Sequence, residues 1–194
     1  MLKVGITGGM GCGKSSVTRL LERSAFRVLD SDQIVRTEVL QDRVVVDALR
    51  ARYGSAVLDA AGAVDRPALA RTVFASDPER QWLEELVHPR VFAAWRNAFE
   101  TDLHASWAVE VPLLFEKGLE NWFDFTVCVA LDPESQLARL ERRGLSRTLA
   151  GQRISKQLPL TRKIELSDFV LWNAGTPEFL QSQVDRLAEA LATA

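Results

Sequence analysis

A glycine-rich segment near the amino terminus constrains the fold more than any other feature. It reads Gly8-Gly9-Met10-Gly11-Cys12-Gly13-Lys14-Ser15 and directly follows an apolar run at residues 2–7 that has the composition of a buried strand. The spacing Gly-x-x-x-x-Gly-Lys-Ser lets backbone N–H groups wrap around phosphate oxygens, brings a lysine to the β- and γ-phosphates, and offers a serine hydroxyl to magnesium. The motif therefore predicts a site for a nucleoside triphosphate.

A glycine-rich turn can match so short a pattern by chance, but the surrounding sequence argues against chance here. A strand precedes the motif, and residues 16–22 continue it as a helix whose amino end would direct partial positive charge at a bound anion. The glycines supply the dihedral angles that such a wrap demands. The residues expected to hold the triphosphate are Gly8, Gly9, Gly11, Cys12, Gly13, Lys14, Ser15 and Ser16, with Ser15 as the Mg²⁺ ligand.

Length, charge and cysteine content narrow the class of protein. The 194 residues suffice for one sizeable α/β domain with insertions, and the formal net charge of −2 provides no global basic field to attract nucleic acid or an anionic membrane. No charged-then-apolar leader and no apolar run long enough to cross a bilayer is found in the sequence. We expect a cytoplasmic protein with small-molecule partners, no nucleic acid and no membrane. The sequence leaves its oligomeric state open, and we favour a monomer.

Cys12 and Cys128 are the only cysteines, and the position of Cys12 inside the loop argues against a structural disulfide. Two interpretations of Cys12 are open. The loop and Lys14 could favour its thiolate and so lower its pKa. Alternatively, Cys12 is a small residue tolerated where serine or alanine would serve, which is the interpretation that we favour.

The rest of the chain alternates between strand-like and helix-like patterns. Apolar, β-branched runs lie at residues 2–7, 26–29, 107–111, 125–131 and 169–172, with helical patterns between them. This alternation predicts an α/β fold with a five-stranded parallel sheet covered by helices on both faces. Two insertions interrupt it: a helical interval at 34–104 and an arginine-rich segment at 134–161. The nucleotide-binding core would then comprise residues 1–33, 105–133 and 162–194.

Ligands of open parallel sheets bind beyond the carboxyl ends of the strands, so the residues at those ends are candidates for chemistry. Asp30-Ser31-Asp32 follows the second strand and places two carboxylates at the edge where the phosphate loop lies. Such a carboxylate can accept or orient a proton from an attacking hydroxyl, or can cap the helix expected to begin near Gln33. We assign Asp32 to chemistry and Asp30 mainly to structure.

The other strand ends carry further polar groups. Glu110, at the end of the third strand, lies where many phosphate-loop enzymes keep a magnesium-bound acid, and Pro112 makes a rigid turn after it. Asp132-Pro133, after the fourth strand, is better explained as an ordinary helix start. The turn Asn173-Ala174-Gly175, after the fifth strand, could offer amide groups to the edge of a base.

The arginine-rich insertion is either a solvated charged helix or a mobile lid. Arg139 and Arg142 or Arg143 are three or four residues apart and so share a helix face, and Gly144 would let the segment turn afterwards. Guanidinium groups aligned in this way can close over a transferring phosphate and stabilise its charge. We favour the lid, and the spacing does not decide which arginine acts.

Ordered motifs along nearly the whole chain carry a specific resemblance. They are Thr7-Gly8-Gly9 with the phosphate loop, Asp30-Ser31-Asp32, Tyr53-Gly54, Gly62 with Asp65-Arg66, Leu86-Val87-His88-Pro89, Val111-Pro112-Leu113-Leu114-Phe115-Glu116, Arg139 with Arg142, Gln157, Lys163 and Asn173-Ala174-Gly175. In these motifs the chain resembles the dephospho-coenzyme A kinase family. The resemblance implies a phosphate-loop fold like that of the nucleoside monophosphate kinases, and transfer of phosphate from ATP with Mg²⁺ to the ribose 3′-hydroxyl of dephospho-CoA.

The resemblance also implies roles for single residues. Asp32 would be the catalytic base, assisted by Lys14 and by Arg139 or Arg142 from a lid at 134–161, and Asn173 would lie near the adenine. The helical interval 34–104 would bind the acceptor. The residues implied on the acceptor side are Asp32, Arg66, His88, Pro112 and Leu113. By itself, His88 before Pro89 indicates a structural histidine at a helix start, so its part in catalysis stays open.

The sequence departs from the family pattern in places, and two other functions remain as alternatives. Cys12 stands where serine or alanine is usual, and the segment after Glu38 lacks the family's Pro-Gly turn, so acceptor contacts there are not transferable. Another small-molecule or nucleotide kinase of the same fold would differ only in its acceptor pocket. A nucleotide-driven switch would show an Asn-Lys-x-Asp segment after a late strand, and Asn173-Ala174-Gly175 does not supply it.

Overall fold

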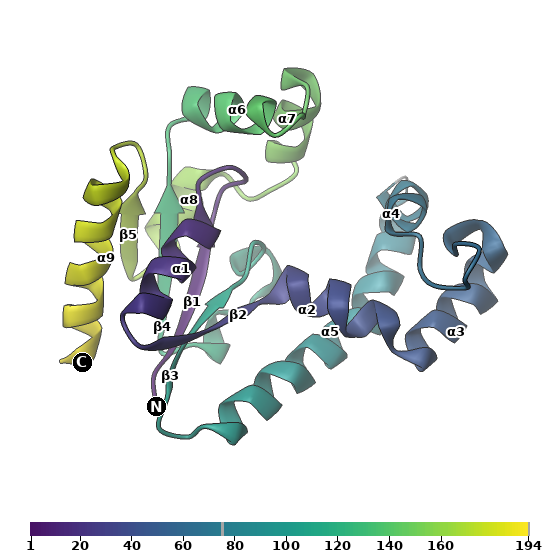
Figure 1. The fold of residues 1–194 in the computed structure, drawn as a ribbon. Coiled ribbons are helices and arrows are strands. Elements are labelled where there is room, and N and C mark those ends of the chain that lie inside the picture. The colour runs from purple at the N-terminus through teal and green to yellow at the C-terminus, as the bar shows by residue number, and fades with distance from the viewer. Residues whose placement is uncertain (75, 194) are drawn as a thin grey trace. The chain divides into compact units, whose positions relative to one another are not determined.

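The computed structural model describes residues 1–74 and 76–193, and their backbone divides into two units (Figure 1). One unit combines Met1–Asp30 with Leu103–Ala194 and contains the sheet. The other, Ser31–Asp102, is built from helices. In the described part of the chain, no helix combines the length and the apolar composition needed to cross a membrane.

The sheet has the predicted form. Its strands in the described residues are all parallel and lie in the order β2-β3-β1-β4-β5. Each strand end lies within one residue of the position expected from the apolar runs, and the fold class is confirmed. The strands are β1 (Lys3–Gly8), β2 (Phe26–Asp30), β3 (Ser106–Glu110), β4 (Phe125–Ala130) and β5 (Phe169–Trp172).

The register of the sheet sets which strand ends are neighbours. Glu110 of β3 pairs with Ile6 of β1 on one side and with Asp30 of β2 on the other. Because β3 lies between β1 and β2, Glu110 is the acidic strand-end residue next to the strand that leads into the phosphate loop. On the far side of β1, Gly8 pairs with Val129 of β4.

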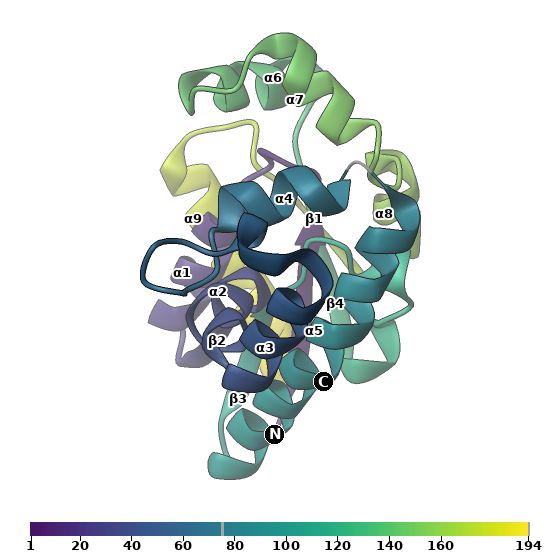
Figure 2. The same cartoon turned by 90° about the vertical axis from the view of Figure 1, so that its right-hand side faces the viewer.

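Helices cover both faces of the sheet. The helices α1 (Lys14–Arg23) and α9 (Pro177–Ala192) pack against each other on one face, whereas α8 (Leu160–Leu166) packs on β1 and β4 at the other (Figure 2). An apolar core cluster lies between the sheet and the helices α1 and α9. It includes Val17 of α1 and Val127 of β4, both fully buried.

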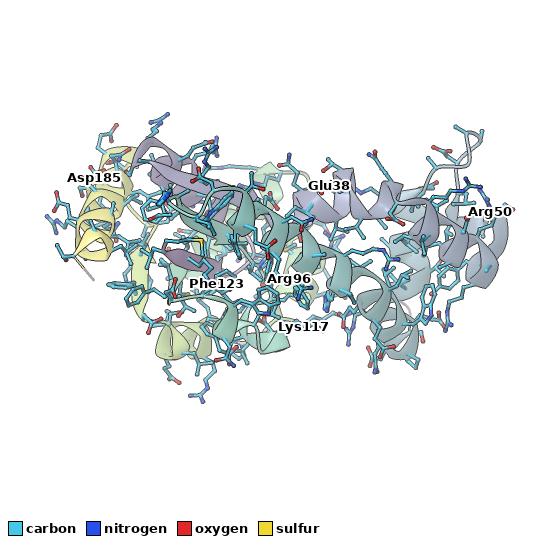
Figure 3. All side chains as sticks on the ribbon, turned by 90° about the horizontal axis from the view of Figure 1, so that it is seen from below. Glu38, Arg50, Arg96, Lys117, Phe123 and Asp185 are labelled. Carbon is cyan, nitrogen blue, oxygen red and sulfur yellow. The ribbon has the colours of Figure 1, made fainter. Side chains whose placement is uncertain are left out.

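The pattern of α9 explains its place in the fold. Val184 and Leu187 are buried against the sheet, while Asp185 between them is exposed on the outer side (Figure 3). The helix begins where Thr176 accepts a hydrogen bond from the N–H of Phe179. A stripe of apolar residues at helical spacing and a capping side chain therefore fix this helix.

Two further helices, α6 (Pro133–Arg142) and α7 (Arg147–Ile154), form the arginine-rich segment. The carboxylate of Asp132 accepts a hydrogen bond of 2.9 Å from the N–H of Ser135, so the expected helix start at Asp132-Pro133 is confirmed. Gly144 has a φ of +87°, in the left-handed region that glycine reaches without steric cost, and turns the chain between the two helices.

The helical unit contains α2 (Ser31–Thr37), α3 (Arg43–Tyr53), α4 (Arg66–Phe74) and α5 (Asp77–Thr101). Its described residues pair as a strand only at the isolated bridge between Leu58 and Val64, as expected for an interval without a buried strand. Arg52 donates two hydrogen bonds to Glu79 and so ties the end of α3 to the start of α5. These bonds, with one from Tyr53, lower the pKa of Glu79 to about 2.

Two local expectations about this unit were wrong. The first helix begins at Ser31 rather than near Gln33, so Asp32 lies inside its first turn and not at its cap. Pro89 was expected at a helix start but lies inside α5, which runs on for 25 residues. Proline costs that helix one backbone hydrogen bond, yet burial of apolar side chains on both sides of it, such as Val87 and Val91, keeps the helix continuous.

Candidate functional site

The phosphate loop connects β1 to α1, and two of its glycines are required by close contacts. Gly8 has a φ of +140°, and a Cβ placed there would lie 2.2 Å from the carbonyl oxygen of Val129. Gly13 has a φ of +97°, and a Cβ placed there would lie 2.2 Å from Nδ2 of Asn173. No larger side chain fits either position without displacing its neighbour, so the loop packs directly on β4 and on the turn after β5.

Lys14 is the first residue of α1, and its side chain turns back over the loop. Only 8% of the residue is exposed, and Nζ donates to the carbonyl oxygens of Gly8 and Gly9 at 3.4 and 3.3 Å. The ammonium group is thereby held among the backbone groups of the loop, next to the amino end of a helix. A site of this kind attracts a phosphate chain through a fixed cation and oriented N–H groups.

Asn173 and Arg139 secure the loop from the side. The buried amide of Asn173 donates a hydrogen bond of 2.7 Å to the carbonyl oxygen of Cys12, and the backbone carbonyl of Asn173 accepts one of 2.8 Å from Arg139. Arg139 also approaches Gly13, because one of its nitrogens lies 3.5 Å from the position of a Cβ there. The structure therefore brings Asn173, Arg139 and the loop together. The expected contact of Asn173 with adenine stays a prediction.

Ser15 and Glu110 place two oxygen ligands together at the end of the sheet. The hydroxyl of Ser15 lies 3.3 Å from Oε1 of Glu110, and Glu110 is 8% exposed. A hydroxyl and a carboxylate are the oxygen donors that Mg²⁺ prefers, and this ion commonly binds through one or two carboxylates together with substrate phosphates. The residues present therefore fit a magnesium ion bound with a nucleotide.

Cys12 is inaccessible and serves as a small residue within the core. Both cysteines, which lie in the described part of the chain, are buried free thiols. Burial raises the pKa of the Cys12 thiol despite the opposing charge of Lys14, so the thiolate interpretation is contradicted. The interpretation as a tolerated small residue is the one that agrees with this environment.

The five arginines of the arginine-rich segment differ in their surroundings. Arg147 forms ion pairs with Glu134 and Glu141 inside the segment, at 2.6 and 3.6 Å. The side chains of three others are exposed and have no hydrogen bond or ion pair to any residue that the structure describes: Arg142, Arg143 and Arg153. Arg139 is thus placed at the loop, while a catalytic role for Arg142 stays a prediction.

The chain after β3 is fixed by a buried ion pair. The fully buried Lys163 of α8 donates hydrogen bonds of 2.8 Å to the carbonyl oxygen of Pro112 and to Oε1 of Glu116. Leu113, next to Pro112, is an exposed apolar residue at this end of the sheet. Lys163 and Glu116 were noted only as parts of motifs, and no local pattern indicates that a lysine will be buried beneath a carboxylate 47 residues away.

The helical unit has a cavity of about 560 Å³ of its own. Asp32 and Arg36 of α2 line it together with Arg66, the first residue of α4, and apolar residues such as Leu69 and Leu83 complete the wall. The structure thus brings the expected residues Asp32 and Arg66 to one cavity.

His88 lies on α5 and is not among the residues that line this cavity. Its ring contacts that of Phe92, with ring centroids 5.8 Å apart. Arg36 was not predicted as a site residue. Its position four residues after Asp32 could have indicated it, because residues at this spacing share a helix face.

Two glutamines that contact the phosphate-loop region were also missed as site residues. Gln136 is buried in α6 beside Gly9 and Gly11, and its amide donates to the carbonyl oxygen of Leu131 at 2.8 Å. Gln157 accepts a hydrogen bond of 3.0 Å from the N–H of Met10. The only local signal for Gln136 was its spacing of four residues from Leu140, which places a polar residue on the buried face of a helix.

Comparison with known proteins gives a consistent picture. The family model for dephospho-CoA kinase matches residues 2–178. The dephospho-CoA kinase of Thermosynechococcus vestitus is 44% identical over 188 residues, which cover 96% of this chain and 93% of that protein. That of Gloeobacter violaceus is 40% identical over 184 residues, which cover 94% and 89%.

Solved structures share the fold. A protein from Thermus thermophilus superposes with a TM-score of 0.85 at 34% identity over 97% of both chains. Dephospho-CoA kinase from Campylobacter jejuni superposes with a TM-score of 0.67 at 20% identity, over 99% of this chain and 98% of that one. Shikimate kinase from Bacteroides thetaiotaomicron superposes with a TM-score of 0.51 at 18% identity, over 98% of each chain. At these identities, both similarities show the fold alone. Together with the phosphate loop and the family motifs at the strand ends, these matches show that the chain belongs to the dephospho-CoA kinase family.

Proposed function

We propose that this dephospho-CoA kinase binds ATP with Mg²⁺ on the phosphate loop and transfers the γ-phosphoryl group to the ribose 3′-hydroxyl of dephospho-CoA, with Asp32 accepting or orienting the hydroxyl proton. The observation that carries the nucleotide part is the loop itself, with the ammonium of Lys14 held among its carbonyl groups. Phosphoryl transfer passes through a loose transition state, so positioning and charge stabilisation supply most of the catalysis. Arg139 or Arg142 supplies the positive charge from the lid.

In this proposal, the acceptor binds to the helical unit. Dephospho-CoA is long and carries a diphosphate, and the cavity between α2 and α4 offers the guanidinium groups of Arg36 and Arg66 beside an apolar wall. Guanidinium groups bind phosphate with paired hydrogen bonds. Asp32 lines the same cavity, which supports its assignment to the acceptor hydroxyl. His88, Pro112 and Leu113 remain proposed acceptor contacts.

A titration of acceptors tests this proposal. Phosphate transfer should depend on dephospho-CoA and not on adenosine monophosphate or shikimate, and Arg66→Leu should raise the KM for dephospho-CoA by about tenfold at an unchanged KM for ATP, because one charged hydrogen bond is lost. Shikimate is the informative alternative, since shikimate kinases share the fold. Transfer to another acceptor would reject the assignment, and ATP hydrolysis without any acceptor dependence would favour a nucleotide switch.

Magnesium is assigned to Ser15 and Glu110. In Glu110→Gln, the affinity of the ADP-bound protein for Mn²⁺, a spectroscopic substitute for Mg²⁺, should fall by about tenfold, because a neutral amide replaces an anionic oxygen next to Ser15. Electron paramagnetic resonance measures the free Mn²⁺ directly and does not depend on turnover. Glu120→Gln changes an exposed glutamate of the same unit and serves as the control. Equal Mn²⁺ affinity in the two variants would exclude Glu110 from the metal site.

We also propose that the protein acts in the cytoplasm as a monomer. Cell fractionation and size-exclusion chromatography with light scattering test the two parts of this proposal separately.

A further inference from the structure

The carboxyl end of the lid segment returns to the sheet through a short connection between α7 and α8. The N–H of Leu158 in this connection donates a hydrogen bond of 2.9 Å to Oε1 of Glu116. The same oxygen accepts from Lys163, which is fully buried and also binds the carbonyl oxygen of Pro112. The return of the lid is therefore attached to a rigid part of the sheet unit by charge-assisted hydrogen bonds, which are stronger than neutral ones.

The residue before this anchor contacts the phosphate loop. The side-chain carbonyl of Gln157 accepts a hydrogen bond of 3.0 Å from the N–H of Met10, and the backbone N–H of Gln157 donates to the carbonyl oxygen of Ile154 in α7. One residue thus connects the last turn of a lid helix, a fixed anchor and the phosphate loop. Met10 precedes the loop N–H groups at the start of α1, which are the ones that hold the α- and β-phosphates.

We propose that Gln157 is a positioning residue for phosphoryl transfer: by holding the N–H of Met10, it sets the backbone on the γ-phosphate side of the loop and couples that backbone to the lid. The inference rests on the ATP-binding role of the loop and not on the identity of the acceptor. Gln157 does not touch the reacting atoms; it acts through Met10. The rest of the loop has its own supports, since Asn173 holds the carbonyl oxygen of Cys12.

Because Gln157 and Asn173 contact different residues of the loop, the loss of Gln157 should impair phosphoryl transfer without impairing nucleotide binding. In Gln157→Leu, kcat should fall by roughly ten- to a hundredfold, because small displacements of reacting groups are costly, whereas ADP, which lacks the γ-phosphate, should bind within about twofold of its original affinity. The backbone amide of Met10 should exchange with solvent at least about tenfold faster, measured by NMR. Gln157→Glu keeps an acceptor oxygen at the same reach and should restore the protection of that amide.

Gln152→Leu is the matched control, because it makes the same change at an exposed position of α7. It should leave kcat, ADP affinity and exchange at Met10 unchanged. The proposal is overturned if Gln157→Leu behaves like this control, or if ADP affinity falls in parallel with kcat, which would indicate a general loss of loop structure. It is also overturned if the Met10 amide exchanges as fast in Gln157→Glu as in Gln157→Leu. Amide exchange and ADP binding need no acceptor, so these outcomes are independent of whether dephospho-CoA is the substrate.

Discussion

In Asp32→Asn, kcat for phosphoryl transfer to dephospho-CoA should fall by roughly 10²–10⁴-fold, the range that a positioned general base contributes. Asparagine keeps the size of the side chain and a hydrogen-bond acceptor, but it cannot take the proton of the attacking hydroxyl. Asp32 is exposed on the first turn of α2 and lines the cavity of the helical unit, whereas the supports of the phosphate loop come from Lys14, Asn173 and Arg139. ATP affinity should therefore change by less than about twofold.

The measurement pairs a coupled assay at saturating acceptor with ATP binding by calorimetry. Asp47→Asn is the matched control, since Asp47 is an exposed aspartate of the same helical unit whose partners are Arg43 and Arg50 on its own helix. Turnover near the original rate in Asp32→Asn would remove Asp32 from the role of base. A loss of ATP affinity equal to the loss of kcat would instead assign Asp32 to nucleotide binding.

The sheet could be predicted from the sequence because its signals are local. Buried parallel strands are short continuous apolar runs, and five such runs lie within one residue of the strands observed. The helix starts at Asp132 and Thr176 likewise follow from a capping side chain with proline at the next position. Pro89 shows the limit of local rules, because long-range burial of α5 outweighs the preference of proline for a helix start.

The contacts of the candidate site were less predictable, because they join residues far apart in the chain. The strand ends directed attention to Glu110 and Asn173, but they did not reveal that the amide of Asn173 donates a hydrogen bond to a loop carbonyl 161 residues away. The sequence identified Gln157 only as part of a family motif. Its contact with the phosphate loop, a hydrogen bond from the N–H of Met10 to its side-chain carbonyl, is visible only in the structure. Side-chain direction depends on packing that no pattern along one chain encodes.

Lys163→Met should lower the free energy of unfolding by about 3–5 kcal/mol, the cost of breaking a buried ion pair by removing one partner. The side chain of Lys163 is fully buried, and that of Glu116 is 15% exposed. Without the lysine, Oε1 of Glu116 keeps only the N–H of Leu158, and Oε2 already has no hydrogen-bond partner among the described residues. For a chain of this length, that loss corresponds to a fall in Tm of roughly 10 °C, measurable by calorimetry.

Arg162 is the control that separates burial from charge. It is the neighbour of Lys163 in α8 and forms an ion pair of 2.6 Å with Glu165, but both members of this pair are more than half exposed. Arg162→Met should therefore cost less than about 1 kcal/mol, because water screens exposed pairs. The double variant Lys163→Met with Glu116→Gln should recover part of the loss, since it removes the unpaired charge as well. If Lys163→Met is no less stable than Arg162→Met, the ion pair does not hold the connection between α7 and α8, and the anchor beside Gln157 must lie elsewhere.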